Sequence, residues 1–269
     1  MMSAMPKIIL VGCGNMGFAL TRGWLNNGWL KSDIVAVDPS DSARQKVTDL
    51  GILATEKIST DPQADIIVLA VKPQHLGETL PAYKQFLNSD PVFLSIVAGK
   101  PIVFLEDILG KNAAIVRGMP NTPVSVGKGM TALVKNKMVK KNQMTASEKL
   151  MGAVGRATWL EDESLMNAVT GISGSGPAYV FLIIEALSKA GVNLGLSEEL
   201  SGELALMTVA GAGELAFKSD LSPTELRRRV TSPGGTTEAA LNVLMRNEEL
   251  VDLFKDAAHA AADRGRDLA

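Results

Sequence analysis

The sequence predicts an α/β fold in which a doubly wound parallel sheet is followed by an all-α C-terminal domain. In the first half, short runs rich in valine and isoleucine alternate with segments of helical spacing, as in parallel strands whose two faces are covered by helices. After about residue 162 we find no alternating strand, and alanine and leucine recur at helical spacing. These two patterns divide the chain into a domain at 1–161 and a second, helical domain at 162–269.

Strands in the first domain are indicated by their β-branched, mostly apolar composition. They are expected at Lys7–Val11, Asp33–Val37, Asp65–Val71, Val92–Val97, Ala114–Arg117, Thr131–Val134 and Ala157–Leu160. Helical spacing at Met16–Trp24 and Ser42–Leu50 fits the first two crossover connections of a parallel sheet. We expect the sheet to end with the strand at 157–160.

The second domain is expected to consist of helices alone. The predicted helices are 178–191, 197–218, 223–230 and 237–265. Pro177 and Pro223 stand where the first turn of a helix tolerates proline. A domain this helical and apolar often joins a second subunit, so we interpret Leu204, Leu206 and Met207 as core or subunit-contact residues. We therefore expect a homo-oligomer.

Composition excludes several classes of function. The chain has 27 Lys and Arg residues against 29 Asp and Glu residues, a net charge of −2, so it has no electrostatic preference for a polyanion such as nucleic acid. The basic cluster Arg227–Arg229 and the lysines within Lys135–Lys141 are interpreted as interface or solvated charges. His75 and His259 are the two histidines and Cys13 the one cysteine, so we expect no metal site and no intrachain disulfide.

The same composition predicts a soluble, cytoplasmic protein. Hydrophobic residues make up 46% and charged residues 21% of the chain, close to globular averages. Met1–Lys7 shows no charged region followed by an apolar core, so no signal peptide is expected. The stretch Ser164–Ile184 lacks charged residues, but glycines, hydroxyl side chains and Pro177 interrupt it, so no membrane span is expected.

A glycine-rich turn follows the first strand. Ile8–Val11 leads into the sequence G-C-G-N-M-G at 12–17, and a helical pattern follows, which is the context that the dinucleotide-binding motif G-x-G-x-x-G requires. Gly12 permits the tight turn, Gly14 lets a pyrophosphate approach the backbone, and Gly17 lets the helix pack on the strand. The motif predicts a Rossmann-type domain that binds a nicotinamide dinucleotide.

Residues at the end of the second strand are expected to contact the adenosine ribose of that cofactor. Asp38 stands where an acidic side chain commonly accepts hydrogen bonds from the adenosine ribose, which favours NADH. Ser40, Arg44 and Lys57 lie nearby in the sequence and offer groups that could pair with the 2′-phosphate of NADPH. Arg44 and Lys57 are equally compatible with plain solvation. The sequence therefore leaves the choice between NADPH and NADH open.

Further candidate cofactor residues follow two other strands, at the carboxyl ends where such sheets bind ligands. They are Ala70, Val71, Lys72 and Pro73 after the third expected strand, and Asn121 and Thr122 after the fifth. Lys72 is interpreted as a capping or cofactor-facing lysine. Asn121 and Thr122 lie between two prolines, which would aim them at the nicotinamide half of the crevice; a purely structural bend is the alternative.

Two glycine-rich loops open helices in the second domain. They are S-G-S-G-P at 173–177 and S-P-G-G-T-T at 232–237. Small side chains, free N–H groups and hydroxyls suit such loops to a carboxylate or phosphate, although ordinary helix caps have the same composition. The pair of loops favours a small anionic substrate.

Five motifs taken in order resemble the pyrroline-5-carboxylate reductases. They are G-C-G-N-M-G at 12–17, A-V-K-P-Q at 70–74, M-P-N-T-P at 119–123, G-I-S-G-S-G-P-A-Y at 171–179 and S-P-G-G-T-T at 232–237. The resemblance spans almost the whole chain. It implies an oxidoreductase that reduces the cyclic imine 1-pyrroline-5-carboxylate to L-proline with NADPH or NADH, the last step of proline biosynthesis.

The resemblance also implies roles for single residues. The cofactor would be held by Gly12, Cys13, Gly14, Asn15, Met16, Gly17, Asp38, Ser40, Arg44, Lys57, Ala70, Val71, Lys72, Pro73, Asn121 and Thr122. The substrate would be held by Ser175, Ser232, Gly234, Gly235, Thr236 and Thr237, with the Thr237 hydroxyl bonded to the ring nitrogen as the catalytic group. The family builds its active site across an interlocked helical homodimer, and many members form larger rings of dimers.

The chain departs from the family pattern at two positions. The common L-K-D-x-V before the last loop reads Leu226–Val230 with Arg228 in place of the acidic residue, and Asp38 stands where many members have a small or neutral residue. Two other readings stay open. One is a two-domain hydroxyacid or sugar-acid dehydrogenase, which needs a base such as histidine or lysine. The other is a nonenzymatic dinucleotide sensor that binds a partner through its helices.

Overall fold

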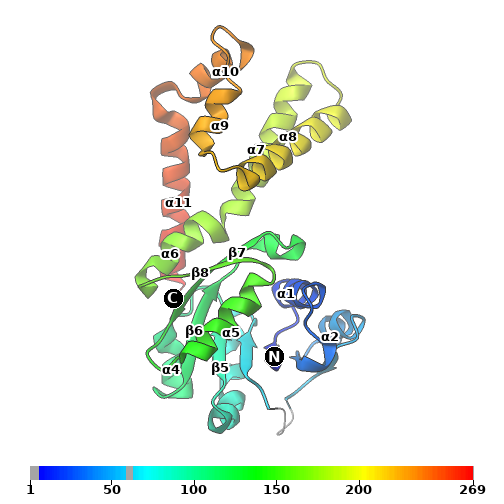
Figure 1. The fold of residues 1–269 in the computed structure, drawn as a ribbon, viewed down its shortest axis with the longest axis vertical. Coiled ribbons are helices and arrows are strands. Elements are labelled where there is room, and N and C mark those ends of the chain that lie inside the picture. The colour runs from blue at the N-terminus through cyan, green and yellow to red at the C-terminus, as the bar shows by residue number, and fades with distance from the viewer. Residues whose placement is uncertain (1–5, 59–62, 269) are drawn as a thin grey trace. The chain divides into compact units, whose positions relative to one another are not determined.

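The computed structural model describes residues 6–58 and 63–268, which form two compact units. The first contains the chain up to Gly174 together with the segment from Ala261 onward, and the second is Ser175–Ala260. Figure 1 shows a sheet flanked by helices in the first unit and helices alone in the second. Residues 1–5, on which the expectation about a signal peptide partly depends, lie outside the described residues.

The first unit is built on an eight-stranded sheet. Its strands are β1 (Ile8–Val11), β2 (Ile34–Val37), β3 (Leu53–Thr55), β4 (Ile66–Leu69), β5 (Val92–Ser95), β6 (Ala114–Met119), β7 (Gly129–Lys135) and β8 (Gly155–Trp159). They lie in the order β3-β2-β1-β4-β5-β6-β7-β8. The chain thus leaves β1 in one direction and returns to its other side at β4, which confirms the predicted doubly wound arrangement.

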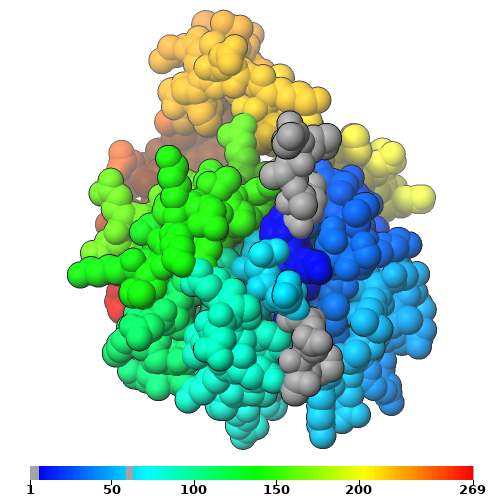
Figure 2. Space-filling model, turned by 60° about the horizontal axis from the view of Figure 1, so that its bottom comes forward, coloured from blue at the N-terminus to red at the C-terminus, as the bar shows by residue number. Residues whose placement is uncertain are grey.

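Helices cover both faces of this sheet. They are α1 (Asn15–Asn26), α2 (Asp41–Thr48), α3 (Leu76–Thr79), α4 (Ile102–Leu109), α5 (Lys141–Gly152) and α6 (Met166–Val169), with the 3-10 segments η1 (Lys31–Asp33), η2 (Pro73–His75), η3 (Leu80–Ser89), η4 (Thr122–Val126) and η5 (Glu163–Leu165). Ile8 and Leu10 of β1 belong to the core with α1, α2 and α5, whereas Ile9 and Val11 belong to the core with α3, η3 and α4. In Figure 2 the blue, cyan and green segments of this unit meet in one continuous surface.

Two features of the sheet differ from the expectation. The sequence analysis does not predict β3, because this strand has three residues and Leu53 is 63% exposed, so no apolar run marks it. The predicted parallel pairing holds from β3 through β6, whereas β7 is antiparallel to β6, a detail that the sequence analysis does not predict. The connection between them, residues 120–128, is shorter than the crossover that a parallel pair requires.

The second unit is all helical, as predicted. Its helices are α7 (Gly176–Asn193), α8 (Glu198–Lys218), α9 (Pro223–Arg229), α10 (Thr236–Leu244) and α11 (Glu249–Asp267), the last of which continues into the first unit. The expected single helix over 237–265 is wrong. Asn247 and Glu248 have φ values of 50° and 59°, in the left-handed region that an α-helix cannot contain, so α10 and α11 are separate.

The helices of the second unit expose a large apolar surface. α7 and α8 pack side by side, as Figure 1 shows, and among their described residues Ser201 and Ala205 are the buried ones. Phe181 is 58%, Leu182 62% and Met207 63% exposed. Many large apolar side chains exposed on two packed helices favour an interaction surface, because soluble monomers rarely leave so many in contact with water.

Two stretches of the described chain pass a length and composition test for membrane spans. They are Glu163–Asn193 and Glu198–Lys218, each with a mean hydropathy of 1.2 over its most apolar part. Composition alone is weak evidence for a span, since helices of soluble proteins pass the same test. Obligate dimer interfaces have a similarly apolar character, because their helices are covered by a second subunit.

Candidate functional site

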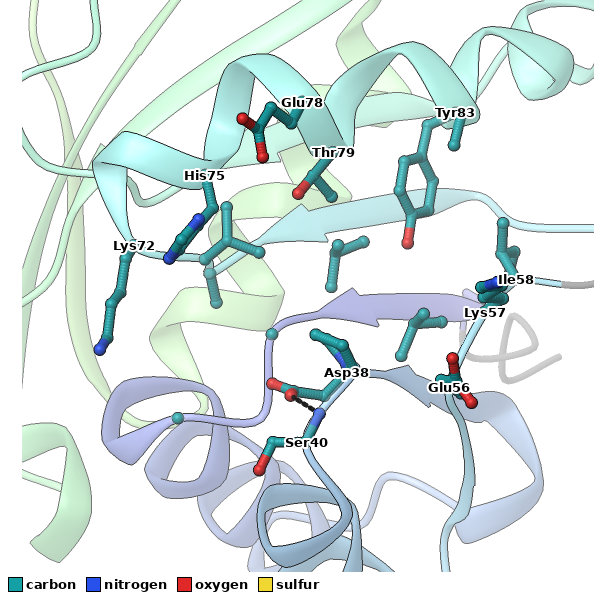
Figure 3. Close-up of a pocket in the computed structure, with 18 of the residues that line it drawn as sticks. Asp38, Ser40, Glu56, Lys57, Ile58, Lys72, His75, Glu78, Thr79 and Tyr83 are labelled. Atoms are coloured by element: carbon teal, nitrogen blue, oxygen red, sulfur yellow. Dashed lines mark hydrogen bonds between the residues drawn. The ribbon is translucent and has the colours of Figure 1, made fainter.

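A pocket of about 940 Å³ lies at the carboxyl ends of β1, β2 and β4. Its walls come from the turn after β1, the loop after β2, the segment after β3 and the run η2–α3–η3 after β4 (Figure 3). The predicted cofactor residues that line it are Gly12, Gly14, Asp38, Ser40, Lys57, Ala70, Val71 and Lys72. The pocket adjoins the switch point between β1 and β4, where doubly wound sheets bind ligands.

The glycine-rich turn has the shape that a pyrophosphate requires. Gly12 has a φ of 101°, and a Cβ there would lie 2.6 Å from the carbonyl oxygen of Ala70. A Cβ on Gly17 would lie 2.1 Å from the carbonyl oxygen of Gly12, so both positions need glycine for close backbone packing. Around Gly14, by contrast, there is open space, and α1 begins at Asn15 with the free N–H groups of its first turn. This cradle fits an anionic ligand.

Asp38 fixes the glycine-rich turn to the end of β2. Its carboxylate accepts hydrogen bonds from the backbone N–H of Cys13 at 2.7 Å and from the backbone N–H of Ser40 at 2.8 Å. Arg44 donates from its guanidinium to the Asp38 carbonyl oxygen at 2.7 Å and pairs with Asp41. Arg44 is therefore held in place rather than solvated alone, and Asp38 organises the loop that the pocket needs.

Cys13 is buried beneath this turn, and its side chain is inert at neutral pH. Burial and, to a smaller extent, the nearby Asp38 carboxylate raise the pKa of the Cys13 thiol to about 12, against the opposing effect of the Arg44 guanidinium. A thiol with such a pKa is almost entirely protonated at pH 8, and the thiolate is the nucleophilic form.

We expect native Cys13 to react with iodoacetamide at pH 8 at least about tenfold more slowly than the same residue in unfolded protein. Because Cys13 is the chain's one cysteine, the mass increase of intact protein reports on this residue alone. Saturating NADPH is expected to slow the reaction further by suppressing local opening of the turn. Equal rates for native and unfolded protein would contradict the buried, protonated thiol.

The other predicted cofactor residues do not line the pocket. Cys13 lies in the glycine-rich turn and Pro73 begins η2, both next to lining residues. Asn15, Met16 and Gly17 lie at the start of α1, and Arg44 lies in α2. Asn121 and Thr122 stand farther along the sheet, at the start of η4 after β6. The Asn121 amide donates to the Ser173 hydroxyl at 3.3 Å and accepts from the backbone N–H of Met130 at 2.9 Å. Asn121 thus joins two of the sequence motifs within the first unit.

The predicted substrate residues all belong to the second unit. Gly235 is the N-cap of α10, so Thr236 and Thr237 occupy its first turn. The backbone N–H of Gly234 donates to the Glu238 carboxylate at 2.7 Å, which fixes the loop against its own helix. Ser175 has the same position at α7, where it is the N-cap and Pro177 follows in the first turn. Both loops therefore present helix N-termini, which favour anions.

Comparisons with known proteins agree along the whole chain. Residues 163–268 match the family described as pyrroline-5-carboxylate reductase dimerisation, and residues 7–99 match the family described as NADP oxidoreductase, coenzyme F420-dependent. Over 270 residues the chain is 41% identical to the pyrroline-5-carboxylate reductase of Pseudomonas aeruginosa, with 98% of this chain and 97% of that protein covered. The chain belongs to the pyrroline-5-carboxylate reductase family. The resemblance inferred from the five motifs is confirmed.

Solved structures of pyrroline-5-carboxylate reductases have the same fold. The structure from Coxiella burnetii is 37% identical, with a TM-score of 0.93 and 99% of each chain covered. The Plasmodium falciparum pyrroline carboxylate reductase with NADP bound is 33% identical, with a TM-score of 0.83 and coverage of 98% of this chain and 99% of that one. The arrangement of a Rossmann-type domain and a helical domain is thus that of the pyrroline-5-carboxylate reductase family.

Arg228 departs from the family's motif but has a local structural role. Its guanidinium donates to the Glu225 carboxylate at 2.8 Å, one turn earlier in α9, and Arg229 also approaches this carboxylate at 3.9 Å. The Arg228 side chain is 73% exposed, so this pair contributes little to stability. The substitution therefore replaces an acidic surface group by a basic one that is paired within its own helix.

Several pocket residues were not identified from the sequence. They are Val11 of β1, Val37 and Pro39 at the end of β2, Glu56 and Ile58 after β3, and His75, Glu78, Thr79, Pro81, Ala82, Tyr83 and Gln85 in η2–α3–η3. The segment follows Lys72 directly, and this position after a central strand was the one available signal. Among the described residues, no group of three or more His, Cys, Asp or Glu side chains is arranged to hold a metal ion.

Proposed function

We propose that the chain is an NAD(P)H-dependent pyrroline-5-carboxylate reductase that reduces 1-pyrroline-5-carboxylate to L-proline, the last step of proline biosynthesis. The observation that carries the proposal is the 41% identity to a pyrroline-5-carboxylate reductase over 98% of the chain, together with a dinucleotide-shaped pocket at the switch point of the sheet. The reaction consumes the imine, one proton and NAD(P)H, and it yields proline and NAD(P)⁺. The dinucleotide, when bound, supplies the hydride.

The residues of this chain bind and orient the reactants. The glycine-rich turn from Gly12 to Gly17 receives the pyrophosphate, and Asp38 holds that turn through two backbone hydrogen bonds. The loop at 232–237 holds the substrate carboxylate at the N-terminus of α10, and the Thr237 hydroxyl bonds to the ring nitrogen. The imine nitrogen carries its own proton, so alignment is the main requirement and no histidine–carboxylate pair is needed.

The proposed assembly is a homodimer formed through the helices of the second domain. Several such dimers would associate into a larger ring. The exposed apolar side chains of α7 and α8 support a subunit contact, since a second copy would remove them from water. The proposed location is the cytoplasm, where NADPH, NADH and a reduced cysteine are all expected. In this proposal the exposed apolar helices bind a second copy of the chain, and the protein binds neither a membrane nor nucleic acid.

The function is tested by following nicotinamide oxidation at 340 nm with purified protein and 1-pyrroline-5-carboxylate, using NADPH and NADH in parallel. We expect consumption of either cofactor together with formation of proline. The ratio of the two kcat/KM values shows whether Asp38 or the cations Arg44 and Lys57 dominate at the ribose. Cofactor binding without imine reduction would contradict the proposal, and turnover of a 3-hydroxy acid instead would indicate a dehydrogenase.

A further inference from the structure

Tyr83 brings a polar group into the deep wall of the pocket. It lies in η3, its side chain is 2% exposed, and it stacks on Phe86 with 6.1 Å between the ring centroids. Figure 3 shows the Tyr83 ring extending from η3, with its hydroxyl directed into the pocket toward the strands. Tyr83 is one of the residues that the sequence did not identify.

The Tyr83 hydroxyl is not one of the enclosed, unpartnered side-chain oxygens in the described part of the chain, and it faces the pocket. Burial and the neighbouring Cys13 thiol raise the pKa of Tyr83 well above its ordinary value, so the hydroxyl stays protonated and can donate a hydrogen bond. A hydroxyl that faces a ligand pocket can donate to an acceptor on the ligand, whereas phenylalanine at the same position could only pack against it. The hydroxyl is therefore explained best by an acceptor that enters the pocket.

The position of Tyr83 indicates which part of a ligand it meets. The same pocket is lined by Asp38 and Ser40 at the end of β2 and by Lys57 after β3. In a doubly wound sheet with this turn, the residues at the end of β2 lie beside the adenosine ribose, and the nicotinamide lies on the other side of the switch point. Tyr83 packs in the same core cluster as Ile58, and Figure 3 shows both on the same side of the pocket as Lys57, so Tyr83 belongs to the adenosine end.

We propose that Tyr83 is a cofactor-binding residue whose hydroxyl donates a hydrogen bond to the adenosine part of the nicotinamide dinucleotide. The proposal rests on the proposed function, because it takes the dinucleotide as the ligand. It assigns affinity for the cofactor to η3, a segment outside the glycine-rich turn and outside the five sequence motifs. Since the adenosine part is common to NADH and NADPH, the contact strengthens the binding of both.

The test compares Tyr83→Phe with the unaltered enzyme, using ADP-ribose as a probe that lacks the nicotinamide. We expect calorimetric titration to show a Kd for ADP-ribose raised about fivefold to tenfold in Tyr83→Phe, the effect of one lost hydrogen bond. NADPH and NADH should lose affinity by the same factor, while kcat at saturating cofactor is unchanged. The Tm of the unliganded variant should equal that of the unaltered enzyme, because the ring and its packing on Phe86 are kept.

Phe86→Leu is the matched control, since it disturbs the same aromatic pair from the other ring and leaves the hydroxyl in place. We expect it to lower the Tm and to keep the Kd for ADP-ribose within about twofold. An unchanged Kd in Tyr83→Phe would overturn the proposal while leaving the reductase function intact. A lower Tm with equal losses of affinity in both variants would also overturn it, because Tyr83 would then act through packing. Failure of the unaltered enzyme to bind ADP-ribose or NADPH would overturn both the proposal and the proposed function.

Discussion

Replacing Gly14 with alanine is expected to raise the Kd for NADPH and NADH about 100-fold, or about 2.7 kcal/mol, without loss of stability. Gly14 has a φ of −64°, which any residue can adopt, and a Cβ there would meet nothing within 4 Å. The folded protein alone therefore tolerates the methyl group. The same space receives the pyrophosphate in the proposed complex, so the methyl group would displace the ligand from the backbone N–H groups.

Two further glycine variants serve as controls for this prediction. Gly152→Ala places a methyl group in open space at the end of α5, away from the pocket, and should change neither the Tm nor the Kd for NADPH. Gly12→Ala should lower the Tm as well as the affinity, because its φ of 101° and the contact with Ala70 both oppose a side chain. Thermal unfolding and fluorescence titration of NADPH measure the two effects separately. Normal binding by Gly14→Ala would show that the dinucleotide does not approach the turn there.

The dinucleotide-binding domain could be predicted from the sequence because the patterns that indicate it each lie within a short stretch of the chain. The apolar run Ile8–Val11, the three glycines of the turn and the start of α1 occur within a few residues, and the structure shows a steric reason for Gly12 and Gly17. The doubly wound order followed from the same alternation of strands and helices, since a parallel sheet has few other connections.

Features that depend on distant contacts were missed. β3 has too few apolar residues to stand out, and it is a strand because β2 offers it unpaired backbone groups. The break between α10 and α11 falls at Asn247 and Glu248, in a stretch without proline or glycine, so helical spacing continues across it. Tyr83 reads as an ordinary core aromatic in the sequence. A binding role for its hydroxyl can be inferred only from the structure, in which η3 lines the pocket.

Thr237→Ala is expected to lower kcat for imine reduction about 100-fold while changing the Kd for NADPH by less than about twofold. Thr237 lies in the first turn of α10, beside the N–H groups that would hold the substrate carboxylate. A hydroxyl that bonds the ring nitrogen aligns the imine for hydride transfer, and misalignment acts on the chemical step rather than on cofactor affinity. Steady-state kinetics and fluorescence titration of NADPH separate the two quantities.

Two further variants, Thr237→Ser and Thr224→Ala, test whether the loss of kcat in Thr237→Ala is due to the missing hydroxyl. The serine variant keeps the hydroxyl and should retain kcat within about tenfold, since only the methyl group that limits the rotamers is lost. Thr224 also lies in the first turn of a helix, α9, and is exposed, so its replacement by alanine controls for a general effect on helix starts and should leave kcat unchanged. Equal losses of kcat and NADPH affinity in Thr237→Ala, or no loss of either, would contradict the catalytic role proposed for the Thr237 hydroxyl. A loss of kcat confined to the alanine variant would instead place the hydroxyl at the reacting imine, because the remaining differences between alanine and serine at this position are small.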